Sequence, residues 1–337
     1  MLNFDPARFL RIQTGTVTIA RDLGTLVGRL VAEGADSLFF MGSGGAGILM
    51  QPATDLMRRA SNLPCHNVLC AEIVLTGHVA LGPKSVVIMP SLSGTTKESI
   101  AAMDYVKARG ATVISITGHA DTPLAKGADH AFVNFAEDDT SCEMFYVTSL
   151  VAALSAMQAR GERSDYDRIS GELAGLPQQL LAVKQAFEPR ADALAQAIAG
   201  DGWHILTGSG AAWPEAYYYG MCILEEMQSI RTRPVHDSDF FHGTLELVEK
   251  GVSVVVFAGE DETRPLTDRL IAFAKGYTDK LTVLDTRDLA TTGLSSDLRA
   301  MLAPALLATV LERLSAHLEV MRNHPLVTRR YYKRVAY

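Results

Sequence analysis

The stretch Met89–Glu98, which reads MPSLSGTTKE, decides the fold of this chain because it joins a strand to a helix through a loop rich in hydroxyls. The apolar run Ser85–Ile88 precedes it, and an amphipathic segment follows it to about Arg109. Gly94 lets the backbone come close to a ligand, and the first N–H groups of the helix add a positive dipole end. Ser91, Ser93 and Thr96 offer hydroxyls to a ligand. We therefore predict a phosphate-binding loop, against the alternative of an ordinary serine-rich helix cap.

This loop differs from the two common nucleotide-binding motifs. A Walker loop needs Gly-Lys-Ser/Thr at the end of its glycine-rich turn, and that tripeptide does not follow Gly94. The dinucleotide fingerprint GxGxxG needs three glycines, whereas this loop has one glycine and relies on hydroxyls. We therefore expect no nucleotide cofactor at this loop.

The composition is that of an ordinary globular protein, with 48% hydrophobic and 20% charged residues, and 337 residues suffice for two domains. The 31 basic and 38 acidic residues give a net charge of −7, which argues against a nucleic-acid or membrane partner. One local basic cluster occurs, in the tail Arg329–Arg334. No continuous apolar run reaches the roughly 18–20 residues that span a bilayer, and no signal-peptide pattern begins the chain.

The four cysteines are spread along the chain without a CxxC pair or a histidine at metal-ligand spacing. Disulfide scaffolds need more cysteines in less chain, and structural zinc needs tighter spacing. We therefore expect reduced, mostly buried thiols, no metal and a cytoplasmic protein. The four are Cys65, Cys70, Cys142 and Cys222.

Short apolar runs alternate with helical patterns along the chain, which predicts an α/β fold with parallel sheets. A polar segment with three glycines, residues 160–175, is interpreted as the connection between two halves, and a long helix over 178–199 follows it. The strands predicted in the first half are 37–41, 66–70, 86–89, 112–117 and 130–134, and the helices are 45–60, 95–109 and 141–159.

The second half repeats the pattern of the first. Its first predicted strand, 203–207, ends in Gly208-Ser209-Gly210, as 38–41 ends in Gly42-Ser43-Gly44. This repetition favours two copies of one sheet fold, residues 1–165 and 166–337, over one large sheet. The other strands predicted here are 253–257 and 280–285, and the helices are 263–275 and 296–317.

The two copies differ in the loop that corresponds to the hydroxyl-rich one. Residues 258–263 read AGEDET, so three carboxylates stand where the first copy offers three hydroxyls. Carboxylates would repel a phosphate, and we therefore expect one phosphate site per chain, in the first half.

These residues resemble the sugar isomerase (SIS) domain family, in the tandem arrangement of the isomerase module of glucosamine-6-phosphate synthase. The resemblance implies two tandem SIS domains, each a five-stranded parallel sheet flanked by helices. In that family an S-x-S-G-x-T loop binds the phosphate of a hexose 6-phosphate, and Ser91–Thr96 matches that loop here. The implied phosphate contacts are Ser91, Ser93, Gly94 and Thr96, with Ser43 from the first-strand loop as a further contact.

The second half contains LEEM at Leu224–Met227 and FHGTLE at Phe241–Glu246, which resemble the catalytic glutamate and the His-Gly-Pro-Leu of SIS isomerases. The resemblance implies that Glu226 is the base and that His242 handles ring opening and oxygen protonation. Glu225 is the alternative base, because adjacent helical residues point about 100° apart and only one can face a site. The tail, RRYYKRVAY after residue 328, is similar to that of the fructosamine-6-phosphate deglycases.

The resemblance implies an enzyme that cleaves a fructosamine 6-phosphate to glucose 6-phosphate and a free amine or amino acid. A proton shuttle between C1 and C2 would carry the reaction, without a cofactor. The alternatives are an aldose–ketose isomerase, an amino-sugar-phosphate deaminase or a non-catalytic sugar-phosphate sensor. The family further implies a homodimer or higher homo-oligomer in which His242 serves the active site of a neighbouring copy.

Overall fold

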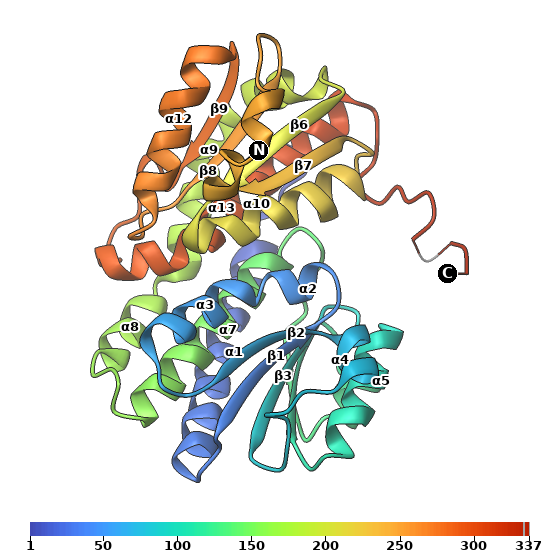
Figure 1. Ribbon diagram of the computed structural model, residues 1–337, viewed down its shortest axis with the longest axis vertical. Coiled ribbons are helices and arrows are strands. Elements are labelled where there is room, and N and C mark those ends of the chain that lie inside the picture. Colours follow the sequence, from blue (N-terminus) through green and yellow to red (C-terminus); the bar gives the residue numbers. More distant parts are fainter. Residues whose placement is uncertain (333, 337) are drawn as a thin grey trace. The chain divides into compact units, whose positions relative to one another are not determined.

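The computed structural model describes residues 1–332 and 334–336, so Lys333 and Tyr337 of the predicted tail motif lie outside the described residues. The chain forms two compact units (Figure 1). The N-terminal unit comprises residues 6–178 and 293–295, and the C-terminal unit comprises residues 1–5, 179–292 and 296–337. The domain division at residues 165 and 166 stays a prediction.

The N-terminal unit contains a parallel sheet of five strands in the order β2-β1-β3-β4-β5, with helices on both faces (Figure 1). β3 has a strand on either side and is buried along its whole length, which is why it reads as a continuous apolar run. The strands are β1 (Ser37–Gly42), β2 (Cys65–Leu69), β3 (Ser85–Ser91), β4 (Thr112–Thr117) and β5 (His130–Val133). The predicted α/β class and the five strands of this half are confirmed.

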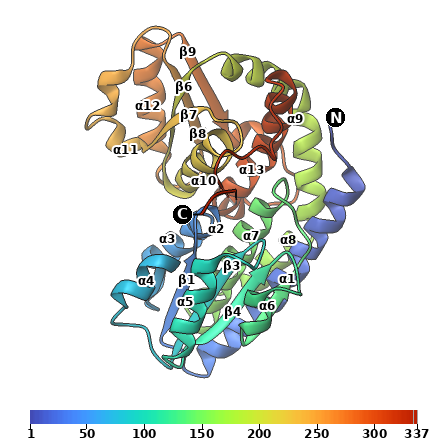
Figure 2. The same ribbon diagram turned by 90° about the vertical axis from the view of Figure 1, so that its right-hand side faces the viewer.

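Two long helices cover one face of this sheet, α1 (Pro6–Ala32) and α7 (Ser141–Ala159), and they pack against each other (Figure 2). The contact is close because glycines on α1 leave room for α7. Oγ of Ser155 donates to the carbonyl of Gly24 at 2.6 Å, and a Cβ at Gly28 would lie 2.7 Å from Oγ of Ser155. The helix α7 was predicted from the sequence, whereas α1 was missed.

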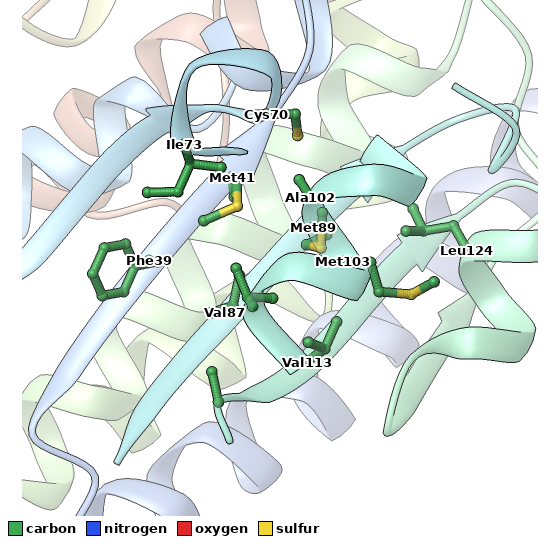
Figure 3. Close-up of a cluster of buried hydrophobic side chains, with 12 residues drawn as sticks. Phe39, Met41, Cys70, Ile73, Val87, Met89, Ala102, Met103, Val113 and Leu124 are labelled. Atoms are coloured by element: carbon green, nitrogen blue, oxygen red, sulfur yellow. The ribbon is translucent and has the colours of Figure 1, made fainter. Parts of the chain in front are cut away.

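The opposite face holds a hydrophobic core between the sheet and the helices α4 (Cys70–Thr76), α5 (Lys97–Lys107) and α6 (Pro123–Gly127). Figure 3 shows this cluster, in which Met89 of β3 packs near Met103 of α5. All of its members are buried, so α5 is held firmly on the strand that leads into it.

Two helix predictions in this unit need correction. The single helix expected over 45–60 is two helices, α2 (Gly45–Ile48) and α3 (Gln51–Ala60), because glycines loosen the first segment and Pro52 starts the second. The connection expected over 160–175 contains a helix, α8 (Tyr166–Leu173), whose inner side buries Ile169 and Leu173. Two apolar residues on one face sufficed for a helix in a mostly polar segment.

The C-terminal unit contains a parallel sheet in the order β7-β6-β8-β9, with four strands in the part of the chain that the structure describes. The five strands implied for this half are therefore a wrong prediction. After β9 the chain forms the short helix η4 (Thr286–Asp288) and then α13, with no strand between them. The strands are β6 (Trp203–Gly208), β7 (Arg231–His236), β8 (Ser253–Ala258) and β9 (Lys280–Asp285).

β7 was missed because it is an edge strand. It pairs with β6 alone, so its exposed positions, Arg231 and Arg233, carry charges that suit an unpaired edge. A search for apolar runs therefore passes over it.

The helices of this unit are α9 (Leu176–Ala199), α10 (Trp213–Tyr218), α11 (Asp237–Phe240), α12 (Arg264–Tyr277) and α13 (Ser296–Met321), and α11 and α12 contact each other (Figure 2). Phe240 of α11 and Leu270 of α12 pack with Val254 of β8 in the core on one face of the sheet. The first residues of the chain also belong here, because Leu2 accepts a hydrogen bond from buried Arg313 and donates one to Glu188.

By length and composition α7 and α13 could cross a membrane, but 89% and 83% of their apolar windows are buried inside the protein. Their apolar residues come from all sides of the helix, which is typical of core helices. All four cysteines are free and buried, as predicted.

Candidate functional site

The loop between β3 and α5 takes its shape from Gly94. This residue has a φ of +62°, and a Cβ there would lie 2.3 Å from Oγ1 of Thr122, so both the backbone conformation and the packing require glycine. Its N–H donates to Oγ of buried Ser91 at 3.1 Å, and its carbonyl accepts from the N–H of Leu124. The loop backbone is therefore fixed before any ligand binds.

Two other hydroxyls of this loop lie at or near the surface. Ser93 is half-buried, and its Oγ accepts hydrogen bonds from Thr95. Thr96 is the N-cap of α5, yet its side chain makes no capping hydrogen bond. The first turn of α5 therefore keeps N–H groups that a bound anion can satisfy, and the exposed Lys97 adds a positive charge there.

Ser43 reaches the same helix from the end of β1. Its Oγ lies 3.4 Å from Oγ of Ser99 in the first turn of α5, and the thiol of Cys70 lies 3.7 Å from that oxygen. Burial raises the pKa of Cys70, so the thiol is neutral and adds no negative charge beside the loop. The structure thus gathers the five predicted phosphate contacts at the carboxyl ends of neighbouring strands, where ligands of parallel sheets bind.

The corresponding loop of the C-terminal unit is filled by carboxylates of the protein itself. Asp261 accepts hydrogen bonds from the N–H groups of Ala211 (2.8 Å) and Thr263 (2.9 Å), at the starts of two helical segments. Glu260 pairs with Arg299 at 2.6 Å. The N–H groups that would bind an anion in this unit are therefore already satisfied.

The fully buried Asp237 lies beside this loop. It is the first residue after β7, the edge strand next to β6, and Cys70 is likewise the first residue after β2, the edge strand next to β1. Its carboxyl accepts hydrogen bonds from the hydroxyls of Thr207 and Thr267. Burial raises the pKa of Asp237, and these hydroxyls act in the opposite direction. No local pattern marks this residue, because it follows a strand that was itself missed.

Glu226 follows a π-helix, η2 (Tyr219–Glu225), rather than the ordinary helix that the sequence predicted. Its N–H donates to the carbonyl of Met221, five residues back, and π-turns of this kind are often found at functional sites. The Glu226 carboxylate is 31% exposed and forms an ion pair with Nε of Arg329 at 2.7 Å.

Glu225, the alternative base, is exposed and accepts a hydrogen bond from Oγ1 of Thr232 on the edge strand β7. The two glutamates thus have different partners, a guanidinium for Glu226 and a hydroxyl for Glu225. No role for Arg329 could be predicted from the tail alone, because a contact across a hundred residues leaves no local pattern.

His242 is exposed on the turn after α11, where its N–H donates to the carbonyl of Asp239 at 2.9 Å. Gly243, with a φ of +147°, follows it, and the neighbouring Phe240 is buried and stacks edge-on with Phe273. The turn is therefore anchored by its aromatic neighbours, while the imidazole stays accessible.

His204 is buried, and its Nδ1 lies 2.7 Å from Oγ of Ser253, which indicates a structural role. Nδ1 of His236 accepts a hydrogen bond from the N–H of Ser238 and so caps α11. Arg264 is held by Asp285 and Asp268, so it joins α12 to β9.

A metal centre is not indicated by the described residues, since no three His, Cys, Asp or Glu side chains among them gather as ligands. In the N-terminal unit the hydroxyls and N–H groups of the loop are able to bind an anion. In the C-terminal unit it is a half-buried carboxylate, a guanidinium bound to it and an exposed imidazole.

This chain is similar to several known proteins. Residues 33–160 match the SIS domain model. The chain is 31% identical over 327 residues to the fructosamine deglycase FrlB of Bacillus subtilis, covering 96% of this chain and 99% of the relative. It is 27% identical over 307 residues to the fructoselysine 6-phosphate deglycase of Escherichia coli K12, covering 91% and 88%.

Solved structures share the whole fold. A Bacillus subtilis structure described as a phosphosugar isomerase superposes with a TM-score of 0.88 at 30% identity, covering 96% of this chain and 99% of that one. The C-terminal domain of glucosamine-fructose-6-phosphate aminotransferase from Francisella tularensis superposes with a TM-score of 0.81 at 16% identity, covering 95% of each chain.

Proposed function

This chain belongs to the SIS-domain family, in its fructosamine deglycase branch, and we propose that it cleaves a fructosamine 6-phosphate to glucose 6-phosphate and a free amine or amino acid. The observation that carries the proposal is the preformed hydroxyl loop around Gly94, in a chain whose full-length relatives are named as deglycases. The loop supplies the anion site that the 6-phosphate needs.

Ser91, Ser93, Gly94 and Thr96 bind the phosphate in this proposal, and Ser43 adds a hydroxyl from the end of β1. Ser91 also shapes the loop, because its oxygen accepts from the N–H of Gly94 while its O–H can donate to the phosphate. Ser93, Thr96 and the N–H groups of α5 make the other direct contacts, since a phosphate satisfies helix N–H groups that lack an internal partner.

Glu226 and His242 carry the proton transfers. The substrate is a 1-amino-1-deoxyfructose, so a proton must leave C1, and a proton must arrive at C2, to convert the ketoamine into an imine. Glu226 takes the C1 proton and returns one to C2, while His242 assists ring opening and moves the oxygen protons. Water then adds to the imine carbon, and the C–N bond breaks to release the amine and glucose 6-phosphate.

The test is to incubate the protein with fructoselysine 6-phosphate and other fructosamine 6-phosphates, and to couple glucose 6-phosphate to its dehydrogenase. We expect turnover that falls by about 100-fold or more in Glu226→Gln and in His242→Ala. Glu225→Gln is the matched control and keeps its activity, because its side chain has a separate partner in Thr232.

Turnover of fructose 6-phosphate or glucosamine 6-phosphate, with silence on the fructosamines, would instead indicate an isomerase or a deaminase. Binding of sugar phosphates without any turnover would indicate a sensor. Loss of activity in Glu225→Gln rather than in Glu226→Gln would move the base by one residue.

We further propose a cytoplasmic homodimer or larger homo-oligomer, in which His242 of one copy serves the substrate bound by another. Its exposure on a surface turn supports this assignment. Mixing inactive Glu226→Gln protein with inactive His242→Ala protein then restores part of the activity after subunit exchange. Failure to restore activity in exchanged oligomers would place Glu226 and His242 of each active site in the same copy.

A further inference from the structure

We propose that Arg329, in the C-terminal tail, is a positioning residue that holds the carboxylate of Glu226 for proton transfer. The inference rests on the proposed role of Glu226 as the base. Its starting observation is the ion pair between Nε of Arg329 and Oε1 of Glu226 at 2.7 Å, in which the guanidinium is 13% exposed. The pair joins Nε to one named carboxylate oxygen, and arginine–carboxylate pairs have geometric specificity.

The guanidinium is itself fixed by the backbone of the tail. Nη1 of Arg329 donates to the carbonyls of Leu326 (2.6 Å) and Thr328 (2.9 Å). The backbone therefore holds Nη1 while Nε pairs with Glu226. An arginine held in this way loses little side-chain freedom on pairing, which favours a defined orientation of the partner carboxylate.

The tail is also tied to the chain just beyond Glu226. The side chain of Gln228 is fully buried, and its Nε2 donates to the carbonyl of His324 at 2.7 Å. Nη1 of Arg322 donates to the carbonyl of Gln228 at 2.5 Å, and the N–H of Leu326 donates to Oε1 of Glu319 at 2.9 Å. The tail therefore holds both the backbone that follows Glu226 and the carboxylate itself.

This anchoring matters because Glu226 lies where helical order ends. η2 finishes at Glu225, and the next residues form turns that end with Ser229 at a φ of +53°. A carboxylate at such a position has several rotamers, whereas a general base must lie within hydrogen-bond reach of the proton it takes. Arg329 selects one orientation, so its loss lowers the rate of the chemical step more than it weakens substrate binding.

The experiment compares Arg329→Gln and Arg329→Lys with Arg330→Gln, a matched control because Arg330 is the exposed neighbour in the same tail. Under the coupled assay we expect kcat to fall by about tenfold in Arg329→Gln, with KM within about twofold. Arg329→Lys keeps the charge and loses the fork, so we expect an intermediate kcat. Arg330→Gln stays within twofold of the unchanged protein, and all three keep its melting temperature.

Addition of guanidinium ion at millimolar concentration is the readout that a merely structural role would not move. We expect it to restore part of the kcat of an Arg329→Ala protein and to leave Arg330→Gln and Glu226→Gln unaffected. If Arg329→Gln fails to fold, the folded Arg329→Lys protein decides: an intermediate kcat supports the proposal, and an unchanged kcat overturns it.

An unchanged or raised kcat in folded Arg329→Gln also overturns the proposal, and a raised kcat would mean that the ion pair inhibits the base. These failures differ from failure of the proposed function. If Glu226→Gln keeps full activity, the base is wrongly assigned, whereas an inactive Glu226→Gln beside a normal Arg329→Gln removes only the role of Arg329.

Discussion

The loop after β3 and the loop after β8 occupy equivalent places, since the strand order β7-β6-β8-β9 corresponds to β2-β1-β3-β4. One loop keeps helix N–H groups available, and the other is occupied by its own side chains. In the first, the N-cap Thr96 makes no side-chain capping bond. In the second, Asp261 holds the N–H groups of Ala211 and Thr263. A carboxylate of the chain thus accepts from backbone N–H groups in the second loop, whereas the side chain of Thr96 leaves those of α5 uncapped.

The pairs of hydroxyls beneath these loops show that the two share one plan. Ser43 contacts Ser99 at 3.4 Å in the N-terminal unit, and Ser209 contacts Thr267 at 2.8 Å in the C-terminal unit. The framework is therefore kept in both units, and a neutral thiol at Cys70 is matched by a buried carboxyl at Asp237. A few acidic side chains account for the difference between the two loops. An anion can bind helix N–H groups only where no carboxylate of the chain already accepts from them.

The largest expected effect separates the glycines of the two loops. Gly94→Ala forces a Cβ into the left-handed region and against Thr122, so we expect kcat/KM to fall by about 100-fold or more. Gly259→Ala is the matched control, since its Cβ would meet Ala212 at 3.5 Å, an ordinary contact, and we expect less than a twofold change. Steady-state kinetics on both variants tests the contrast, and equal losses would contradict it.

The hydroxyls give the next effect. Ser93→Ala and Thr96→Val each remove a proposed phosphate contact, and hydrogen bonds to charged groups contribute roughly 1.5–3 kcal/mol, so we expect KM to rise by about tenfold or more with little change in kcat. Thr263→Val is the control in the other loop, because its hydroxyl bonds to Asp261 and Ser209. A rise of KM in this control would show that the second loop also contacts the substrate.

Asp261→Ala should act on stability alone. It removes the acceptor from two helix-terminal N–H groups, and a lost cap costs about 0.5–2 kcal/mol, so we expect the melting temperature to fall by a few degrees while KM stays unchanged. Differential scanning calorimetry with parallel kinetics measures both. An unaltered melting temperature, or a KM that changes, would argue against Asp261 as the internal occupant of this loop.

The smallest effect concerns pH. Burial raises the pKa of Asp237 above its ordinary 3.8, so the folded protein keeps this proton to a higher pH than the unfolded chain does. The free energy of unfolding therefore falls as the pH rises from about 3.8 through the folded-state value. We expect Asp237→Asn to lose this dependence and to gain stability relative to the unchanged protein between acid and neutral pH.

Thermal melts over that pH range measure the effect, with Cys70→Ser as the control at the corresponding position of the N-terminal unit. A serine hydroxyl does not titrate in this range, so the control keeps the pH dependence of the unchanged protein. Parallel curves for Asp237→Asn and the unchanged protein would show that this carboxyl makes no such contribution.

Sequence patterns were enough to predict the α/β class, the five strands of the first half, the repeated strand-to-glycine step and the hydroxyl loop. Each of these is a local pattern: a buried strand is a run of apolar residues, and Ser91–Thr96 lies within one turn of the chain. The internal repeat also indicated, from AGEDET alone, that the second loop differs in charge.

Three features became visible only in the folded chain: the edge strand β7, the absence of a fifth strand from the described C-terminal sheet, and the partners of the acidic groups. Whether Asp261 repels a ligand or caps a helix depends on the N–H of Ala211, fifty residues away. The contact between Glu226 and Arg329 likewise joins residues a hundred positions apart. Such pairings follow from how packed elements bring distant segments together, and a local pattern carries no record of them.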